Sequence, residues 1–115
     1  MEARTLEFGV RIYKLSSAIP RQWENRVISR QLLRAGTSIG ANYREAVHAS
    51  SRKQFITMLE ISQRECAETE YWLDLIVKCG LMDKQRLEPL RKECRELRAI
   101  LTSSIVTAKK NRKPQ

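Results

Sequence analysis

The chain has 115 residues, 42% of them hydrophobic and 30% charged, and a formal net charge of +9 at pH 7. This length suits one domain with one core, and no run of about 18 apolar residues predicts a membrane span. The first residues hold no apolar signal core and Cys66, Cys79 and Cys94 form no C-x-x-C pair, so we expect a cytoplasmic protein with buried, reduced thiols.

Four glycines and three prolines leave little material for turns, which favours long helices, and the apolar pattern along the chain predicts four of them. The first helix spans about residues 2–17. It carries two neighbouring apolar stripes, Leu6, Val10 and Tyr13 on one and Phe8, Ile12 and Leu15 on the other. Pro20 then interrupts the pattern and is well placed to open the next helix.

The second helix, about residues 21–47, contains a run of small and polar groups at residues 34–46. One inward stripe consists of Ile28, Leu32, Ala35, Ile39, Asn42 and Ala46, and a neighbouring stripe of Leu33, Gly36, Gly40, Tyr43 and Val47. Each glycine costs roughly 1 kcal/mol against alanine inside a helix. We therefore expect another helix to approach this one closely at the glycines.

The third and fourth helices follow short turns. Serines in residues 48–51 can cap the third helix, about 52–78, whose apolar side recurs at Phe55, Leu59, Ser62, Cys66, Thr69, Leu73 and Ile76. Gly80 is well suited to follow the C-terminus of the third helix, and Asp83 is well suited to cap the N-terminus of the fourth. The apolar side of the fourth helix consists of Leu87, Leu90, Cys94, Leu97, Leu101 and Ile105. Pro89 leaves two alternatives, a kink or a helix that begins at the proline.

The segment from residue 8 to residue 81 resembles a known family. The resemblance rests on the run 34–46, on Ser50-Ser51-Arg52 followed by Phe55, Leu59 and Ile61, on residues 65–73, and on Cys79-Gly80-Leu81. These features are similar to the four-helix-bundle proteins encoded in intervening sequences of bacterial 23S rRNA genes. The resemblance implies a fold and a homopentameric ring, and no defined activity. The family is also distantly similar to accessory proteins of diversity-generating retroelements, helical pentamers that bind a reverse transcriptase and nucleic acid.

We therefore predict an all-α, single-domain fold. Residues 1–108 form an antiparallel up-down-up-down four-helix bundle, and 109–115 form a basic, solvated tail. The predicted core comprises Ile28, Leu32, Ile39, Phe55, Leu59, Cys66, Leu73, Leu97 and Leu101. Trp23 and Trp72 are expected in the core or in a subunit interface.

Little in the sequence points to catalysis. His48 is the only histidine and lies in a predicted turn. Glu65 and Glu68 lack the Glu-x-x-His pairing of carboxylate metal sites in bundles. We predict no enzyme activity, no catalytic residue, no metal site and no cofactor.

A polar set near the middle of the bundle has two interpretations. Buried polar groups persist only when they are hydrogen-bonded. Ser38, Asn42, Glu45, Glu65 and Glu68 therefore form either an interhelical network that fixes register, with Arg34 as its cation, or the wall of a ligand pocket.

Rows of arginine are the candidates for function. Arg26, Arg30 and Arg34 recur every four residues, where like charges repel unless an anion meets them. The candidate nucleic-acid-binding residues are Arg26, Arg30, Arg34, Arg44, Arg91, Arg95, Arg98, Lys109, Lys110, Arg112 and Lys113. The alternative is that these rows are solvated faces. Residues 54–77 hold five acids against one base, so acidic and basic faces are also candidates for pairing between subunits.

The expected function is a non-catalytic, oligomeric nucleic-acid-binding or ribonucleoprotein accessory protein. RNA is favoured over DNA, and a reverse transcriptase is a candidate partner through the resemblance. The alternative is a protein–protein interaction scaffold whose basic charge serves solubility or subunit pairing.

Overall fold

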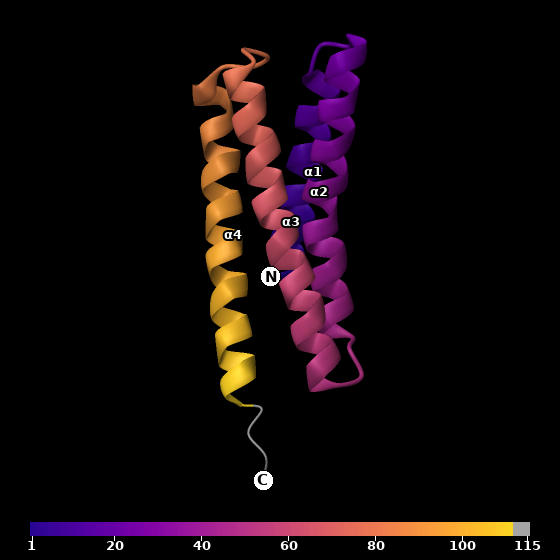
Figure 1. Cartoon of the computed structure of the whole chain (residues 1–115), viewed down its shortest axis with the longest axis vertical. Coiled ribbons are helices and arrows are strands. Elements are labelled where there is room, and N and C mark those ends of the chain that lie inside the picture. Colours follow the sequence, from indigo (N-terminus) through magenta and orange to yellow (C-terminus); the bar gives the residue numbers. More distant parts are fainter. Residues whose placement is uncertain (112–115) are drawn as a thin grey trace.

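The computed structural model describes residues 1–111 as four helices: α1 (Glu2–Ala18), α2 (Trp23–Val47), α3 (Arg52–Lys78) and α4 (Lys84–Lys110). Each helix runs antiparallel to the one before it, and α4 returns beside α1 (Figure 1). The bundle is about 56 Å long and 22 Å wide, and residues 1–111 contain no strand. The predicted all-α, up-down-up-down bundle is confirmed.

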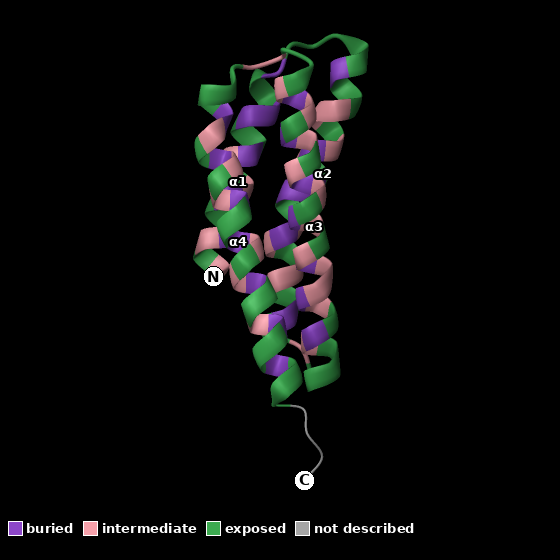
Figure 2. Cartoon of the chain, turned by 60° about the vertical axis from the view of Figure 1, so that its left-hand side comes forward, coloured by how far each residue is buried: buried purple, intermediate pink, exposed green. Residues whose placement is uncertain are grey.

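One end of the bundle contains fewer helices than the other. α1 has 17 residues, against 25 in α2 and 27 in each of α3 and α4. Its N-terminus therefore lies part-way along the bundle, and only α2, α3 and α4 continue to the lower end (Figure 2). None of the four helices between residues 1 and 111 has the length and apolar character needed to cross a bilayer.

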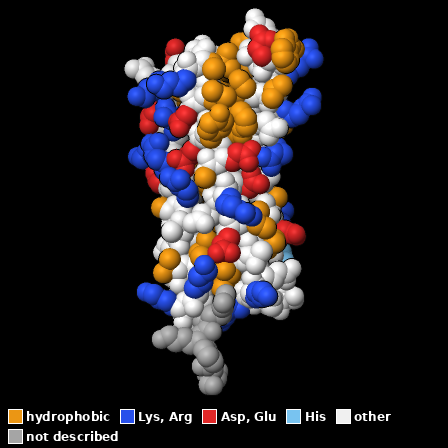
Figure 3. Space-filling view, in the orientation of Figure 1, with side chains coloured by type: hydrophobic (Ala, Val, Ile, Leu, Met, Phe, Trp, Pro, Cys, Tyr) orange, Lys and Arg blue, Asp and Glu red, His pale blue; other side chains and the backbone are white. Residues whose placement is uncertain are grey.

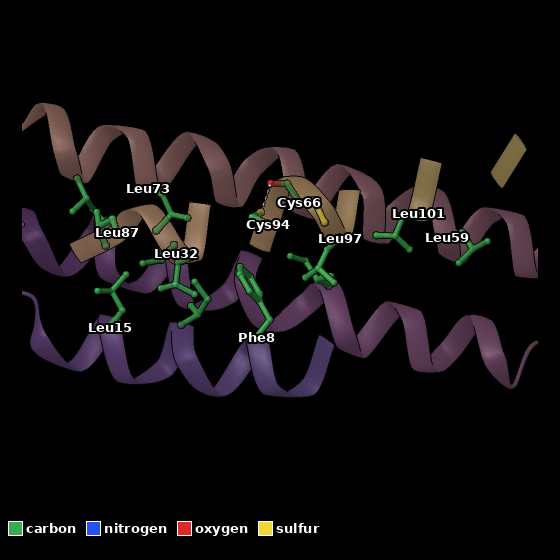
Figure 4. Close-up of a cluster of buried hydrophobic side chains, with 14 of the residues drawn as sticks. Phe8, Leu15, Leu32, Leu59, Cys66, Leu73, Leu87, Cys94, Leu97 and Leu101 are labelled. Carbon is green, nitrogen blue, oxygen red and sulfur yellow. Dashed lines mark hydrogen bonds between the residues drawn. The ribbon is translucent and has the colours of Figure 1, made fainter. Parts of the chain in front are cut away.

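The core lies where apolar spacing predicted it. Every predicted inward position of α4 is buried, and so is every one of α3 except Phe55. Figure 4 shows Phe8, Leu32, Leu73 and Leu97 pointing into this common interior from four different helices. Ile28 and Phe55 are only partly buried, which corrects two of the predicted core positions. Both lie in the first two turns of their helices, near an end of the bundle, where less protein surrounds them.

Only one of the two apolar stripes of α1 enters the core. Phe8, Ile12 and Leu15 are buried, whereas Leu6, Val10 and Tyr13 are exposed, Tyr13 by 60%. Trp23 at the start of α2 is 74% exposed, which excludes the core and leaves the other predicted place, a subunit interface. The bundle therefore carries large apolar side chains on its outside.

The two glycines in α2 admit close approach by α1, as predicted. A Cβ on Gly36 would lie 2.8 Å from both Cγ atoms of buried Ile12, and one on Gly40 would lie 3.2 Å from Oγ1 of Thr5. Because both glycines lack a Cβ, α1 can pack directly against the backbone of α2 at these two positions.

The ends of α3 follow the predicted chemistry. Ser51 Oγ accepts a hydrogen bond from the backbone N–H of Gln54 at 3.1 Å. Gly80 has a φ of +71°. The N–H groups of Gly80 and Leu81 donate to the carbonyls of Val77 and Ile76, the Schellman pattern of a helix C-terminus.

The boundaries of α2 and α4 differ from expectation in detail. α2 begins at Trp23, so Pro20 lies in the connection, where its carbonyl accepts a hydrogen bond from Asn25 Nδ2 at 3.1 Å. α4 begins at Lys84 and continues through Pro89, so the helix does not begin at the proline. It extends to Lys110, which makes the first two residues of the expected tail helical.

Candidate nucleic-acid interface

Arg34 is held by two glutamates of α3. Its Nη1 lies 3.6 Å from Glu65 Oε2, and its Nη2 donates to Glu68 Oε2. Trp72 Nε1 donates to the same Glu68 oxygen at 3.0 Å. Hydrogen bonds from Trp72 and from Arg34 lower the pKa of Glu68, and Glu68 raises the pKa of Arg34. This arginine therefore joins α2 to α3 and is not a free cation.

The rest of the predicted polar set does not join this cluster. Ser38 Oγ donates to the carbonyl of Arg34 at 2.6 Å, and Asn42 Nδ2 donates to the carbonyl of Ser38 at 2.8 Å, both within α2. Glu45 is exposed and has no hydrogen-bond or ion-pair partner within residues 1–111. The structure thus brings together Arg34, Glu65 and Glu68 and leaves Ser38, Asn42 and Glu45 outside.

The buried polar link between α2 and α3 is a different residue. Ser62, fully buried, donates its hydroxyl to the carbonyl of Ile39 at 2.8 Å. Its signal in the sequence was a serine on the apolar stripe of α3, but its acceptor is a backbone group that no side-chain pattern reveals.

The arginine row of α4 is neutralised within the chain. Arg91 lies 2.8 Å from Asp74, and Arg98 lies 3.1 Å from Glu70, both acids of α3. Arg95 contacts Glu88 on its own helix at 3.2 Å. Near the end of α4, Lys109 lies 3.0 Å from Glu60.

All five acids of α3 have a basic partner in the same chain, in α2 or in α4. Pairing of this acidic segment with basic faces of another subunit would therefore compete with these internal ion pairs. Figure 3 shows the result, with basic and acidic side chains interspersed beside a group of hydrophobic side chains on the upper part of one face.

The remaining candidate cations in residues 1–111 have no such partners. Arg26, Arg30, Arg44 and Lys110 are exposed, and none forms an ion pair within the described part of the chain. Arg112 and Lys113 lie outside the described residues. After internal pairing, the unneutralised candidates are concentrated on α2.

A groove between α1 and α2 lies next to Arg44. It encloses about 410 Å³, and its walls are mainly the exposed apolar stripe of α1, Leu6, Val10 and Tyr13, with Gly40 and Ala41 of α2. The sequence showed this stripe, but not that it remains uncovered in the single chain.

Two of the three cysteines are buried. Cys94 Sγ donates to the carbonyl of buried Cys66 at 3.3 Å (Figure 4), and this hydrogen bond together with burial raises the pKa of the Cys94 thiol. Cys79 is exposed, which corrects the expectation of three buried thiols, because it caps α3 at the end of the bundle. No group of three or more His, Cys, Asp or Glu side chains in residues 1–111 is arranged to hold a metal ion.

The fold and the surface together define a small antiparallel four-helix bundle with a basic edge along its second helix. The chain belongs to the family of 23S rRNA-intervening sequence proteins, whose sequence model matches residues 2–103. The predicted family is thereby confirmed.

A solved structure agrees with this assignment. The chain is similar to a protein of unknown function from the S23 ribosomal protein family of Bacteroides thetaiotaomicron, known from a 1.70 Å crystal structure. The two share 40% sequence identity and a TM-score of 0.86, over 90% of this chain and 96% of the other. A comparison with curated proteins gave no match.

Proposed function

We propose that this chain is a non-catalytic, oligomeric nucleic-acid-binding protein. The observation that carries the proposal is the contrast between Arg26, Arg30 and Arg44, which have no acidic partner in residues 1–111, and the α4 row, which is paired. Unpaired guanidinium groups on one side of a helix attract phosphates, and they incur no cost of breaking an ion pair when a phosphate binds.

RNA is the favoured ligand, and this preference rests on the family's link to 23S rRNA. The arginines themselves contact phosphates equally well in either nucleic acid. We therefore expect binding that depends weakly on sequence.

Assembly into a homo-oligomer is supported by the exposed apolar side chains of α1. Leu6, Val10 and Tyr13 line a groove that is open in the single chain, and burial of such a surface favours association. A ring of five follows from the family resemblance. It would repeat the arginines of α2 in every subunit and raise the affinity for a long polyanion. Light scattering that finds a 13.4 kDa particle at micromolar concentration contradicts this part.

The same groove favours the alternative, a scaffold that binds proteins only. The two functions differ in their response to salt. Phosphate contacts weaken by a logarithmic slope of about 0.7 to 0.9 per neutralised phosphate, whereas association through apolar surface persists as salt rises.

The test compares two triple variants that each remove three positive charges. We expect Arg26→Gln, Arg30→Gln and Arg44→Gln together to weaken RNA binding in fluorescence anisotropy and to reduce its salt slope. The matched control replaces Arg91, Arg95 and Arg98 with glutamine, and we expect a smaller loss because those arginines are paired. Circular dichroism checks that both variants fold. Equal binding by the α2 variant and the wild type overturns the proposal.

A further inference from the structure

A second pocket lies at the corner where α1 ends and α2 begins. It encloses about 320 Å³ between the last turn of α1, the connection and the first three turns of α2. Three arginines line it, Arg21, Arg26 and Arg30, and no acidic residue does. None of the three forms an ion pair within residues 1–111. The charge of the lining is therefore wholly positive.

The uncharged polar groups of the pocket are almost all committed to backbone carbonyls. Ser17 Oγ donates to the carbonyl of Tyr13 at 3.0 Å, and Ser29 Oγ to that of Ser16 at 3.1 Å. Asn25 Nδ2 donates to Pro20, as described above. The two serine hydroxyls have thus used their only hydrogens, whereas Asn25 has used one of the two on its amide nitrogen.

Ser16 differs from these groups because its hydroxyl has no partner at all within residues 1–111. It is only 9% exposed, and its Oγ has no hydrogen-bond partner. A buried hydroxyl without a partner is unfavourable and rare in folded proteins. This Oγ is shielded from solvent, so an oxyanion in the pocket supplies the acceptor that Ser16 lacks once the hydroxyl rotates toward the lining.

We propose that this corner pocket binds a phosphomonoester group, the terminal phosphate of a nucleic acid or of a free nucleotide. A phosphomonoester carries close to two negative charges near neutral pH, which suits three guanidinium groups and one hydroxyl donor better than a singly charged diester does. The pocket is a recess in the surface. A terminal phosphate can enter it more readily than an internal phosphate, which has a nucleotide attached on both sides. The inference deepens the proposed function, since Arg26 and Arg30 belong to both.

The first experiment compares ligands that differ only in the terminal phosphate. One short RNA is prepared with a 5′-phosphate and with a 5′-hydroxyl, and AMP and adenosine serve as the free pair. We expect the phosphorylated member of each pair to bind at least about tenfold more tightly, as hydrogen bonds to a charged group predict. Because the second pKa of a phosphomonoester is about 6, this preference should shrink between about pH 7.5 and pH 5.

The second experiment uses Ser16→Ala, with Ser17→Ala as its matched control. Ser16→Ala should reduce the preference for the phosphorylated ligand by about tenfold while leaving the melting temperature unchanged or raised, because it removes an unpaired buried hydroxyl. Ser17→Ala should leave the preference intact. Arg30→Gln should reduce it at least as much as Ser16→Ala, with no change in fold.

The outcomes separate this inference from the proposed function. Equal affinity for phosphorylated and unphosphorylated RNA overturns the pocket and leaves nucleic-acid binding standing. Binding of AMP that is lost in Ser16→Ala and Arg30→Gln, with no binding of RNA, supports the pocket and overturns nucleic-acid binding. Absence of binding to every ligand overturns both.

Discussion

The α3–α4 pair and the α1–α2 pair are held together by different contacts. α3 and α4 meet through long apolar stripes flanked by ion pairs, and every acid of α3 contacts a basic side chain of the same chain. α1 and α2 meet through glycines, and within residues 1–111 no ion pair joins them. Apolar side chains and unpaired arginines remain on the outside of that second pair.

The difference shows that net charge does not locate a binding face. α4 carries as many candidate arginines as the row on α2, yet its charges are balanced by neighbours. A phosphate that binds α4 must compete with carboxylates already in place. At Arg26 and Arg30 of α2, no paired carboxylate competes with the phosphate.

The largest expected effect tests the close approach of α1 and α2. Gly36→Ala should lower the free energy of unfolding by about 1–3 kcal/mol, because the new Cβ overlaps the buried side chain of Ile12. This loss exceeds the gain of up to about 1 kcal/mol that alanine brings to a helix. Chemical denaturation measures the difference.

Gly9→Ala is the control for that substitution. A Cβ on Gly9 would come no closer than 3.8 Å to Thr37, so we expect a gain in stability of up to about 1 kcal/mol. Equal effects at Gly9 and Gly36 would falsify the account of glycine-mediated packing.

A smaller effect concerns acid stability and the α1–α4 contact. Hydrogen bonds from Arg4, at 2.7 and 2.9 Å, lower the pKa of Glu93 below its ordinary value of 4.5. The stabilisation is therefore present above pH 4.5 and is lost as the pH falls through the pKa of the folded state. We expect the melting temperature to fall below that pH.

Two variants sharpen this result. Glu93→Gln should lower stability at neutral pH and reduce the further loss in acid. Glu45→Gln, at an exposed carboxylate outside any ion pair in residues 1–111, should leave the pH profile unchanged. A Glu93→Gln profile parallel to that of the wild type contradicts the assigned role of the Arg4–Glu93 pair.

At the α2–α3 contact, Trp72→Phe should raise the pKa of Glu68. The hydrogen bond from the indole N–H contributes most to the lowered pKa of Glu68, and the hydrogen bond from Arg34 remains in the variant. Carbon-13 NMR of the carboxylate during titration measures the change. A Glu68 pKa that does not move would show that Arg34 alone controls this carboxylate.

The smallest expected effect separates paired from unpaired surface arginines. Arg95→Gln removes an exposed ion pair with Glu88 and should cost less than about 1 kcal/mol. Arg26→Gln removes no ion pair within residues 1–111 and should be neutral in thermal denaturation. A loss at Arg26 larger than that at Arg95 would mean that Arg26 has a structural role.

Local patterns in the sequence were enough to predict the helices and much of the core. The inward positions of α4, such as Leu97 and Leu101, could be predicted from the spacing of apolar residues, because α4 has one continuous apolar stripe and therefore one side to bury. Ser51 and Gly80 marked the ends of α3 because capping and positive φ depend on residues within a few positions. The glycines of α2 predicted a close neighbour for the same local reason.

Tertiary structure alone decided which patterns meet. α1 has two apolar stripes, and the positions of α2 and α4 determine that Phe8 and Ile12 are buried while Leu6 and Tyr13 are not. The sequence left two roles open for Arg34, a phosphate contact or the cation of an interhelical network. The fold decides for the network, because it places Glu68, 34 residues away in the sequence, against Arg34. Burial and ion pairing are properties of surfaces in contact, and helical periodicity gives the direction of a side chain but not what lies opposite it.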